Sequence, residues 1–204
     1  MLNEVKLAFQ ENKLAICISA AILIISMILG YLLEPYAYGY MNPVIENLAR
    51  KVESGAIQLT FGDIFFNNLR IIFMMFIFGV IFFFSTVLLA FNGFFVGYYV
   101  AASRNIHVLL YIIPHGIFEL SSCVLACSSG FILFNFIYRF FKTLLHQENK
   151  PFSDKLTDSF ESSYDKLIQA CIIFLVSIVL MAISGFIEAY LTIPIAKFVI
   201  SILS

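Results

Sequence analysis

The sequence predicts an all-α, polytopic membrane protein with about five transmembrane helices, the third of them short, broken or re-entrant, and with amphipathic interfacial helices. Hydrophobic residues make up 61% of the 204 residues and charged residues only 12%, about half the usual share in a soluble domain. Several apolar runs reach the roughly 20 residues that a helix needs to cross a bilayer. The connections between them are too short for a soluble domain, so we expect residues 1–204 to form a single integral membrane domain.

The first span is expected at about residues 14–33. Its apolar run is longer than that of a cleavable signal peptide, and the residues before it carry mixed charge. An amphipathic helix on the membrane surface should follow, because Asn42 can cap a helix whose first position is Pro43. The apolar residues of that helix fall on one stripe and are Val44, Ile45, Leu48 and Val52.

The second span is expected at about residues 69–90. The helix that contains it should begin near Thr60, because Asp63 follows three residues later. A threonine and a carboxylate at this spacing form a weak version of the capping box. The chain therefore enters this helix through a polar stretch before it becomes apolar.

The third span, at about residues 92–112, is expected to be short or broken. Only roughly 17 Å of helix separates Asn92 from Arg104, whereas the hydrocarbon core of a bilayer is about 30 Å thick. One ordinary span does not fit this segment. Either it is a short or re-entrant helix, or it breaks near residues 103–107 and is completed by the apolar residues that follow.

The fourth span is expected at residues 114–138, with Pro114 either kinking a longer helix or beginning a new one. Residues 139–166 are the most basic segment, so the positive-inside rule predicts that this loop and the N-terminus are cytoplasmic in the plasma membrane. The fifth span should cover residues 167–187, and the tail after Pro194 is too short to cross. A second interfacial helix is indicated by apolar residues at helical spacing, namely Leu156, Phe160, Tyr164 and Leu167.

Charge and cysteine content exclude some partners and some chemistry. The chain has 12 basic and 13 acidic residues, so it has no basic field that would hold nucleic acid. All four cysteines lie in apolar runs, which argues against an extracellular disulfide framework. We interpret them as small, buried, unpaired residues; they are Cys17, Cys123, Cys127 and Cys171.

His115 and Glu119 lie four residues apart inside an apolar segment, so they share one face of a helix. A lone carboxylate in hydrocarbon either takes up a proton or finds a polar partner. We therefore predict a buried polar cluster in the membrane around these two residues. Its other candidate members are Asn67, Asn68, Arg70, Asn92 and Arg104.

Two strips of small residues at spacing four are expected to pack against each other. Small side chains at this spacing let two membrane helices approach closely. The strips could join helices of one protomer, which we favour, or form a dimer interface. The first strip consists of Gly93, Gly97 and Ala101, and the second of Ser122, Ala126 and Gly130.

A metal site is only weakly indicated. His115, Glu119 and Cys123 lie on one line of a helix, but a catalytic zinc needs three protein ligands and an open position, and no second histidine is nearby. We therefore expect no bound metal and no other cofactor. Glu188, near the end of the last span, is interpreted as interfacial and solvated.

A family resemblance comes from an ordered set of motifs. The order is "FFNNLR", a glycine at position 79, "NGFFVG", "PHGIFELSS" and a small-residue helix that ends at Gly130. This arrangement resembles the stage II sporulation protein M family of integral membrane proteins. The pattern falls on Asn67, Asn68, Asn92, Gly93, Gly97, Pro114, His115, Gly116 and Glu119.

The resemblance implies a small polytopic protein without a catalytic domain. In endospore formers the similar namesake belongs to a complex with peptidoglycan-cleaving enzymes, and the resemblance implies a role as their membrane anchor. Our leading hypothesis is thus a homo-oligomeric scaffold, a dimer, for such envelope enzymes, without catalytic residues of its own. The alternatives are a transporter or channel subunit that uses the His115–Glu119 face, and an intramembrane metallohydrolase.

Overall fold

The computed structural model describes residues 2–54, 60–105, 108–147 and 151–203, and every regular element in these ranges is helical. The predicted all-α membrane fold is confirmed. Five helical stretches are long and apolar enough to cross a membrane, and they are Lys13–Leu32, Phe61–Val80, Phe84–Ser103, Val108–His146 and Tyr164–Ile202. The chain is therefore a multi-pass membrane protein in contact with the lipid bilayer.

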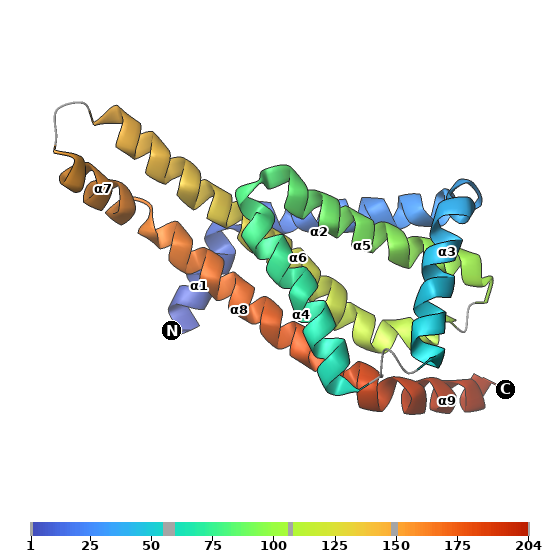
Figure 1. The fold of residues 1–204 in the computed structure, drawn as a ribbon. Helices are drawn as coiled ribbons and strands as arrows, with labels where there is room; N and C mark the ends of the chain where they lie inside the picture. The colour runs from blue at the N-terminus through green and yellow to red at the C-terminus, as the bar shows by residue number, and fades with distance from the viewer. Residues whose placement is uncertain (1, 55–59, 106–107, 148–150, 204) are drawn as a thin grey trace.

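The bundle is built around one long helix, α6 (Val108–His146). This helix contacts α2 (Lys13–Leu32), α4 (Phe61–Ile77), α5 (Phe82–Ser103) and α8 (Tyr164–Phe186). Figure 1 shows α8 running beside α6 over most of its length and α2 lying beside α5. The remaining elements are α1 (Leu2–Glu11), α3 (Glu34–Glu53), α7 (Phe152–Glu161), α9 (Thr192–Leu203), a 3₁₀ turn η1 (Phe78–Val80) and a π-helical turn η2 (Ile187–Leu191).

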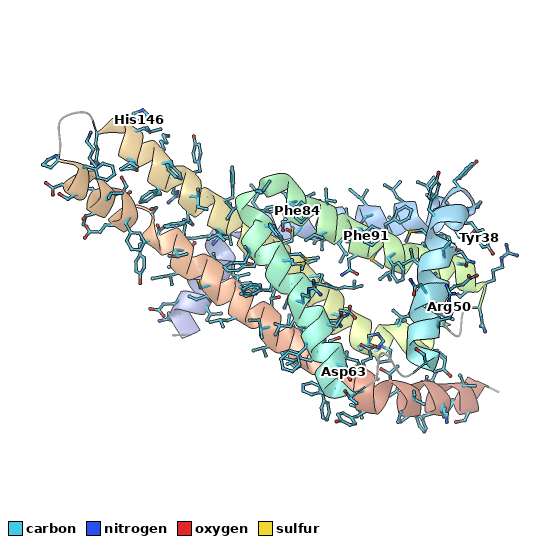
Figure 2. All side chains as sticks on the ribbon, in the orientation of Figure 1. Tyr38, Arg50, Asp63, Phe84, Phe91 and His146 are labelled. Carbon is cyan, nitrogen blue, oxygen red and sulfur yellow. The ribbon has the colours of Figure 1, made fainter. Side chains whose placement is uncertain are left out.

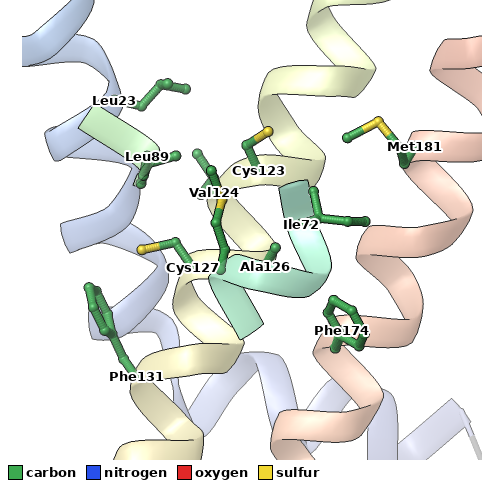
Figure 3. Packing of buried hydrophobic residues seen from close by; sticks show 11 residues of the cluster. Leu23, Ile72, Leu89, Cys123, Val124, Ala126, Cys127, Phe131, Phe174 and Met181 are labelled. Carbon is green, nitrogen blue, oxygen red and sulfur yellow. The ribbon is translucent and has the colours of Figure 1, made fainter. Parts of the chain in front are cut away.

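The sequence of α6 explains why it occupies the centre. Residues 122–132 are all buried, and most of them are serine, alanine, cysteine or glycine. Small side chains on every face let neighbouring helices approach from several directions. In Figure 3, Cys123, Val124 and Ala126 lie between Leu23 and Leu89 on one side and Phe174 and Met181 on the other.

The turn between α4 and α5 corrects the predicted second span. We expected one helix over residues 69–90, but α4 ends at Ile77, η1 follows, and Ile81 is non-helical before α5 begins. Residues 69–90 are apolar on both sides of the turn, so hydropathy gives no sign of it. The turn is fixed by packing, because a Cβ on Gly79 would overlap the backbone of Gly130.

The third and fourth spans also differ from the prediction. Instead of a short or broken span at residues 92–112, α5 is a continuous helix of 22 residues that ends at Ser103. The expected break is present, since Arg104 ends α5 in the left-handed conformation at φ 49°. The fourth helix begins at Val108, and Pro114 lies inside α6, so the predicted alternative of a longer helix that contains this proline is the one observed.

Helices are present in both segments that were predicted to be interfacial, but with different boundaries. Asn42 does not cap a helix, because α3 already begins at Glu34 and continues through Pro43. The Asn42 side chain instead donates a hydrogen bond to Glu46 across 2.8 Å. Thr60 does cap α4, since its hydroxyl accepts a hydrogen bond from the Asp63 amide at 3.3 Å. In the second predicted interfacial helix, Leu156 and Phe160 lie in α7, whereas Tyr164 and Leu167 lie in α8.

The outer surface of the bundle is apolar, as a lipid-facing surface requires. Phe84 and Phe91, labelled in Figure 2, point outward from α5 and are 45% and 57% exposed. Val179 on α8 is 58% exposed. The interpretation of all four cysteines as buried was wrong for Cys17 and Cys171, which are unpaired but exposed on this surface. Their runs are apolar because they face lipid, not because they are enclosed by protein.

A polar network joins the corner between α1 and α2 to the start of α8. Lys166, only 6% exposed, donates hydrogen bonds to Glu11 at 3.0 Å and to Gln169 at 2.7 Å. The Gln169 amide also donates to Glu11 at 2.8 Å and accepts from Asn12 at 2.7 Å. Glu11 is the one member of this network that is partly exposed. The hydrogen bonds of the network therefore stabilise the charge of Lys166, which is otherwise buried.

Glu11 should make the stability of this corner depend on pH. Hydrogen bonds from Gln169 and Lys166, followed by the charge of Lys166, hold the pKa of Glu11 below its ordinary 4.5. A lowered folded-state pKa contributes stability above pH 4.5 that is lost as the pH falls through the folded value. The difference in melting temperature between wild type and Glu11→Gln should be constant from about pH 6 to 8 and shrink below about pH 4.5. A difference that does not change with pH would contradict this assignment.

Candidate functional site

Three ionisable side chains meet between α6 and the end of α8. His115 and Glu119 project from one face of α6, and Glu188 reaches them from η2. One ligand atom from each residue lies within 4.8 Å of the others. All three residues are partly buried. The predicted pairing of His115 with Glu119 thus forms part of a three-residue cluster, which we call the HEE cluster.

The histidine ring of the HEE cluster is oriented by α9. The Nδ1 atom of His115 lies 3.2 Å from the hydroxyl of Thr192. That hydroxyl also donates a hydrogen bond to the carbonyl of Ile187 at 3.1 Å. The backbone carbonyl of His115 accepts a hydrogen bond from Ser184 at 3.0 Å. Both the ring and the backbone of this histidine are therefore held by residues from the C-terminal part of the chain.

The π-helical turn brings Glu188 into the cluster. A proline ring clashes with the carbonyl four residues earlier in a regular α-helix. Pro194 stands in this relation to Tyr190, which lies in the π-helical turn between α8 and α9. The wider turn over Ile187–Leu191 accommodates the proline. Such π turns are rare and are often found at functional sites.

The other predicted members of the polar cluster are distributed differently. Asn92 donates a hydrogen bond to the sulfur of Cys123 at 3.3 Å, one helical turn beyond Glu119 on α6. Asn67 and Arg70 on α4 are exposed, as is Arg104 at the end of α5, and Asn68 is partly buried. Within the described ranges, no hydrogen bond or ion pair links these four residues to His115 or Glu119.

The two small-residue strips do not pack against each other as predicted. Gly93 and Gly97 face α2, where an added Cβ would overlap Ser26 and the carbonyl oxygen of Met27. Gly130 faces α4 and η1, with its Cβ position 2.7 Å from the Met75 carbonyl oxygen. The glycines of α5 thus pack on α2, whereas Asn92, about 100° around α5 from Gly93, faces α6 and bonds to Cys123.

The sequence held signals for these contacts that we did not use. On α2, the buried residues are Ser19, Leu23, Ser26 and Gly30, a small-residue pattern that matches the glycines of α5. On the seam between α6 and α8, the hydroxyls of Ser122 and Ser177 each donate to the other's backbone carbonyl, at 2.8 and 2.9 Å. Glu188, interpreted from the sequence as interfacial and solvated, is instead partly buried in the HEE cluster and lies in the π-helical turn that precedes Pro194.

Comparison with known proteins supports the resemblance. A profile of the family described as stage II sporulation protein M matches residues 18–193. The chain belongs to this family. The match to the stage II sporulation protein M family covers all five membrane-length helices at least in part and includes His115, Glu119, Glu188 and Thr192.

Two relatives of this family member come from Methanocaldococcus jannaschii. The uncharacterized protein MJ0793 is 34% identical over 151 residues, which cover 71% of the present chain and 78% of the relative. The uncharacterized protein MJ0706 is 24% identical over 201 residues, which cover 94% of the present chain and 87% of the relative. No solved structure matches the chain.

Proposed function

We propose that this protein is a membrane scaffold that holds a partner protein through an arm beyond the membrane core. The arm consists of the end of α6, from Tyr138 to His146, together with α7. At 39 residues, α6 is about 58 Å long, whereas the hydrocarbon core is about 30 Å thick. The extension of α6 and α7 past the bundle, visible at the upper left of Figure 1, carries the proposal.

The arm carries a surface suited to binding a protein. A groove between its two helices is lined by Phe140, Leu156, Thr157, Phe160 and Glu161. Leu156 and Phe160 are 37% and 43% exposed although they lie outside the membrane-length helices. Exposed apolar residues with a polar rim are typical of interaction surfaces. Aromatic contacts from Phe160 to Phe136 and Tyr164 keep the groove in a defined shape.

The position of the arm suggests how a partner would be held. Its basic residues include Arg139, Lys142 and Lys155, and under the positive-inside rule this composition favours a cytoplasmic arm. The family resemblance implies an envelope enzyme, such as one that remodels peptidoglycan, as the partner. An enzyme that acts outside the cell would meet the arm through its own cytoplasmic or membrane segment. A dimer of the scaffold would need a surface other than the glycine strips, which are filled within the chain.

Site-specific crosslinking in native membranes tests this proposal. A photoreactive amino acid in place of Thr157, in the groove, should give a discrete adduct with an envelope enzyme. The matched probe at Val179, on the lipid-facing side of α8, should not give this adduct. Leu156→Glu should abolish the adduct, whereas Leu145→Glu, which changes a 77% exposed residue outside the groove lining, should preserve it. Adducts only with lipid or with a second copy of the chain would contradict the scaffold.

Ion or solute transport is a second candidate, favoured by the HEE cluster. Three ionisable side chains within 4.8 Å of one another in membrane-length helices are typical of an ion or proton pathway. Transport predicts flux through the purified protein in proteoliposomes that is lost in Glu119→Gln. The same substitution should leave the crosslink at Thr157 unchanged if the protein is only a scaffold.

A further inference from the structure

We propose that His115, Glu119 and Glu188 bind one divalent transition-metal ion, with Zn²⁺ the best match to the donor set. The proposal does not depend on the arm or on its partner. It rests on the positions of the three side chains, on the hydrogen bond that orients His115, and on the charge of two neighbouring carboxylates.

The three donors have the spacing of an incomplete coordination shell. Ligand atoms around a tetrahedral zinc, with bonds of about 2.0–2.1 Å, lie about 3.3 Å from one another. In the HEE cluster the corresponding atoms lie within 4.8 Å. Binding of one ion would therefore need the three ligand atoms to move closer together by up to about 1.5 Å. Two donors come from consecutive turns of α6 and the third from η2, so the ion would join two segments of the chain.

The hydrogen bond to Thr192 sets the tautomer that a metal ligand needs. A threonine hydroxyl has one hydrogen, and the Thr192 hydroxyl directs it to the carbonyl of Ile187. With that hydrogen on the Ile187 carbonyl, the hydroxyl oxygen can accept a hydrogen bond from Nδ1–H of His115, and this tautomer leaves the Nε2 lone pair available. Metal-binding histidines characteristically donate their second ring N–H to an oxygen in this way.

The carboxylates supply an electrostatic reason for a cation. Glu119 and Glu188 lie close together and partly buried, where two negative charges repel each other strongly. In residues 2–54, 60–105, 108–147 and 151–203, neither forms an ion pair with lysine or arginine. A divalent cation between them would offset both charges at once.

The donor set also restricts which metals fit. One imidazole and two carboxylates suit Zn²⁺ or Mn²⁺, whereas Cu⁺ prefers thiolate and thioether ligands. Cys123, a candidate from the sequence, is not part of the three-residue group, and its sulfur instead receives the hydrogen bond from Asn92. With three protein ligands, a tetrahedral ion would keep one position for water or another small ligand.

Metal binding by the purified full-length protein tests the proposal. After chelator treatment, titration with Zn²⁺ should give one bound ion per chain and a higher melting temperature. Glu119→Gln and Glu188→Gln should each lose the bound ion, whereas Glu161→Gln, which changes an exposed residue of the arm, should keep it. Thr192→Val leaves all three ligands in place but should weaken Zn²⁺ binding about 10- to 100-fold.

Two results would overturn the metal site. The first is a wild-type protein that binds no Zn²⁺, and the second is undiminished binding in both glutamine variants. Should those variants fail to fold, Co²⁺ bound to the wild type decides. Visible cobalt absorption that Zn²⁺ displaces and that lacks a sulfur-to-cobalt band supports the His–Glu–Glu site. A sulfur band, or no cobalt absorption, contradicts it.

Discussion

Gly97→Val is expected to destabilise the protein strongly by separating α5 from α2. A Cβ at this position would overlap the carbonyl oxygen of Met27 and lie 3.0 Å from the amide nitrogen of Tyr31. Both are backbone atoms, so no side-chain rotation can make room. Gly30 has the same relation to the backbone of Phe94, so the two helices interlock at closely spaced points. We expect a loss of about 3 kcal/mol or more in the free energy of unfolding, at the upper end of overpacking substitutions.

The matched control for this substitution is Gly39→Val in α3. Nothing lies within 4 Å of the Cβ position of Gly39, so the same side chain is added without a clash. Valine also lowers backbone freedom in both variants, and only the contact with a neighbouring helix differs. Thermal unfolding in detergent, followed by circular dichroism, should show a much lower melting temperature for Gly97→Val than for Gly39→Val. Equal melting temperatures would mean that α2 and α5 do not pack as described.

Lys166→Met is expected to release α1 from the bundle. The substitution keeps an apolar side chain of similar length but removes the charged hydrogen bonds to Glu11 and Gln169. Such bonds are worth about 1.5–3 kcal/mol when buried. The partial exposure of Glu11, 41% for its side chain, reduces the expected loss to about 1–2 kcal/mol. Asn12 still donates to Gln169, so the rest of the network should persist.

Hydrogen–deuterium exchange gives a local measurement of this effect. In Lys166→Met the amides of Leu2–Glu11 should exchange faster, whereas those of α6 should change little. Lys197→Met on α9 makes the same chemical change at an exposed residue and should leave exchange in α1 unaltered. Unchanged exchange in α1 after the Lys166 substitution would show that this lysine does not hold the N-terminal helix.

The membrane fold follows from the sequence because it depends on composition over long windows. A run of about 20 apolar residues forms a helix in lipid, since every backbone group must find a partner within its own segment. The five-helix prediction succeeded for this reason. The turn at Phe78–Val80 could not be found in the same way, because the residues before and after it are equally apolar.

The candidate site was predictable only in part. The spacing of His115 and Glu119 placed them on one helix face, and that part of the arrangement needs no knowledge of other helices. Glu188, 69 residues further along than Glu119, joins them through the antiparallel packing of α8 on α6 and the π turn before Pro194. The packing of α8 on α6 is not visible as a local pattern around Glu188, and Pro194 alone does not predict the π turn, because Pro43 and Pro114 lie inside regular α-helices.

By itself, the sequence determined that this protein is a helical membrane protein. It also determined where the main polar residues lie along their helices and which family pattern they share. Only the tertiary structure decided that Gly93 and Gly97 face α2, that Gly130 faces Gly79, and that Glu188 completes the HEE cluster. Periodicity fixes the face of a helix on which a side chain lies. Which helix covers that face depends on contacts between segments far apart in the chain, where one small residue or one changed turn selects the neighbour.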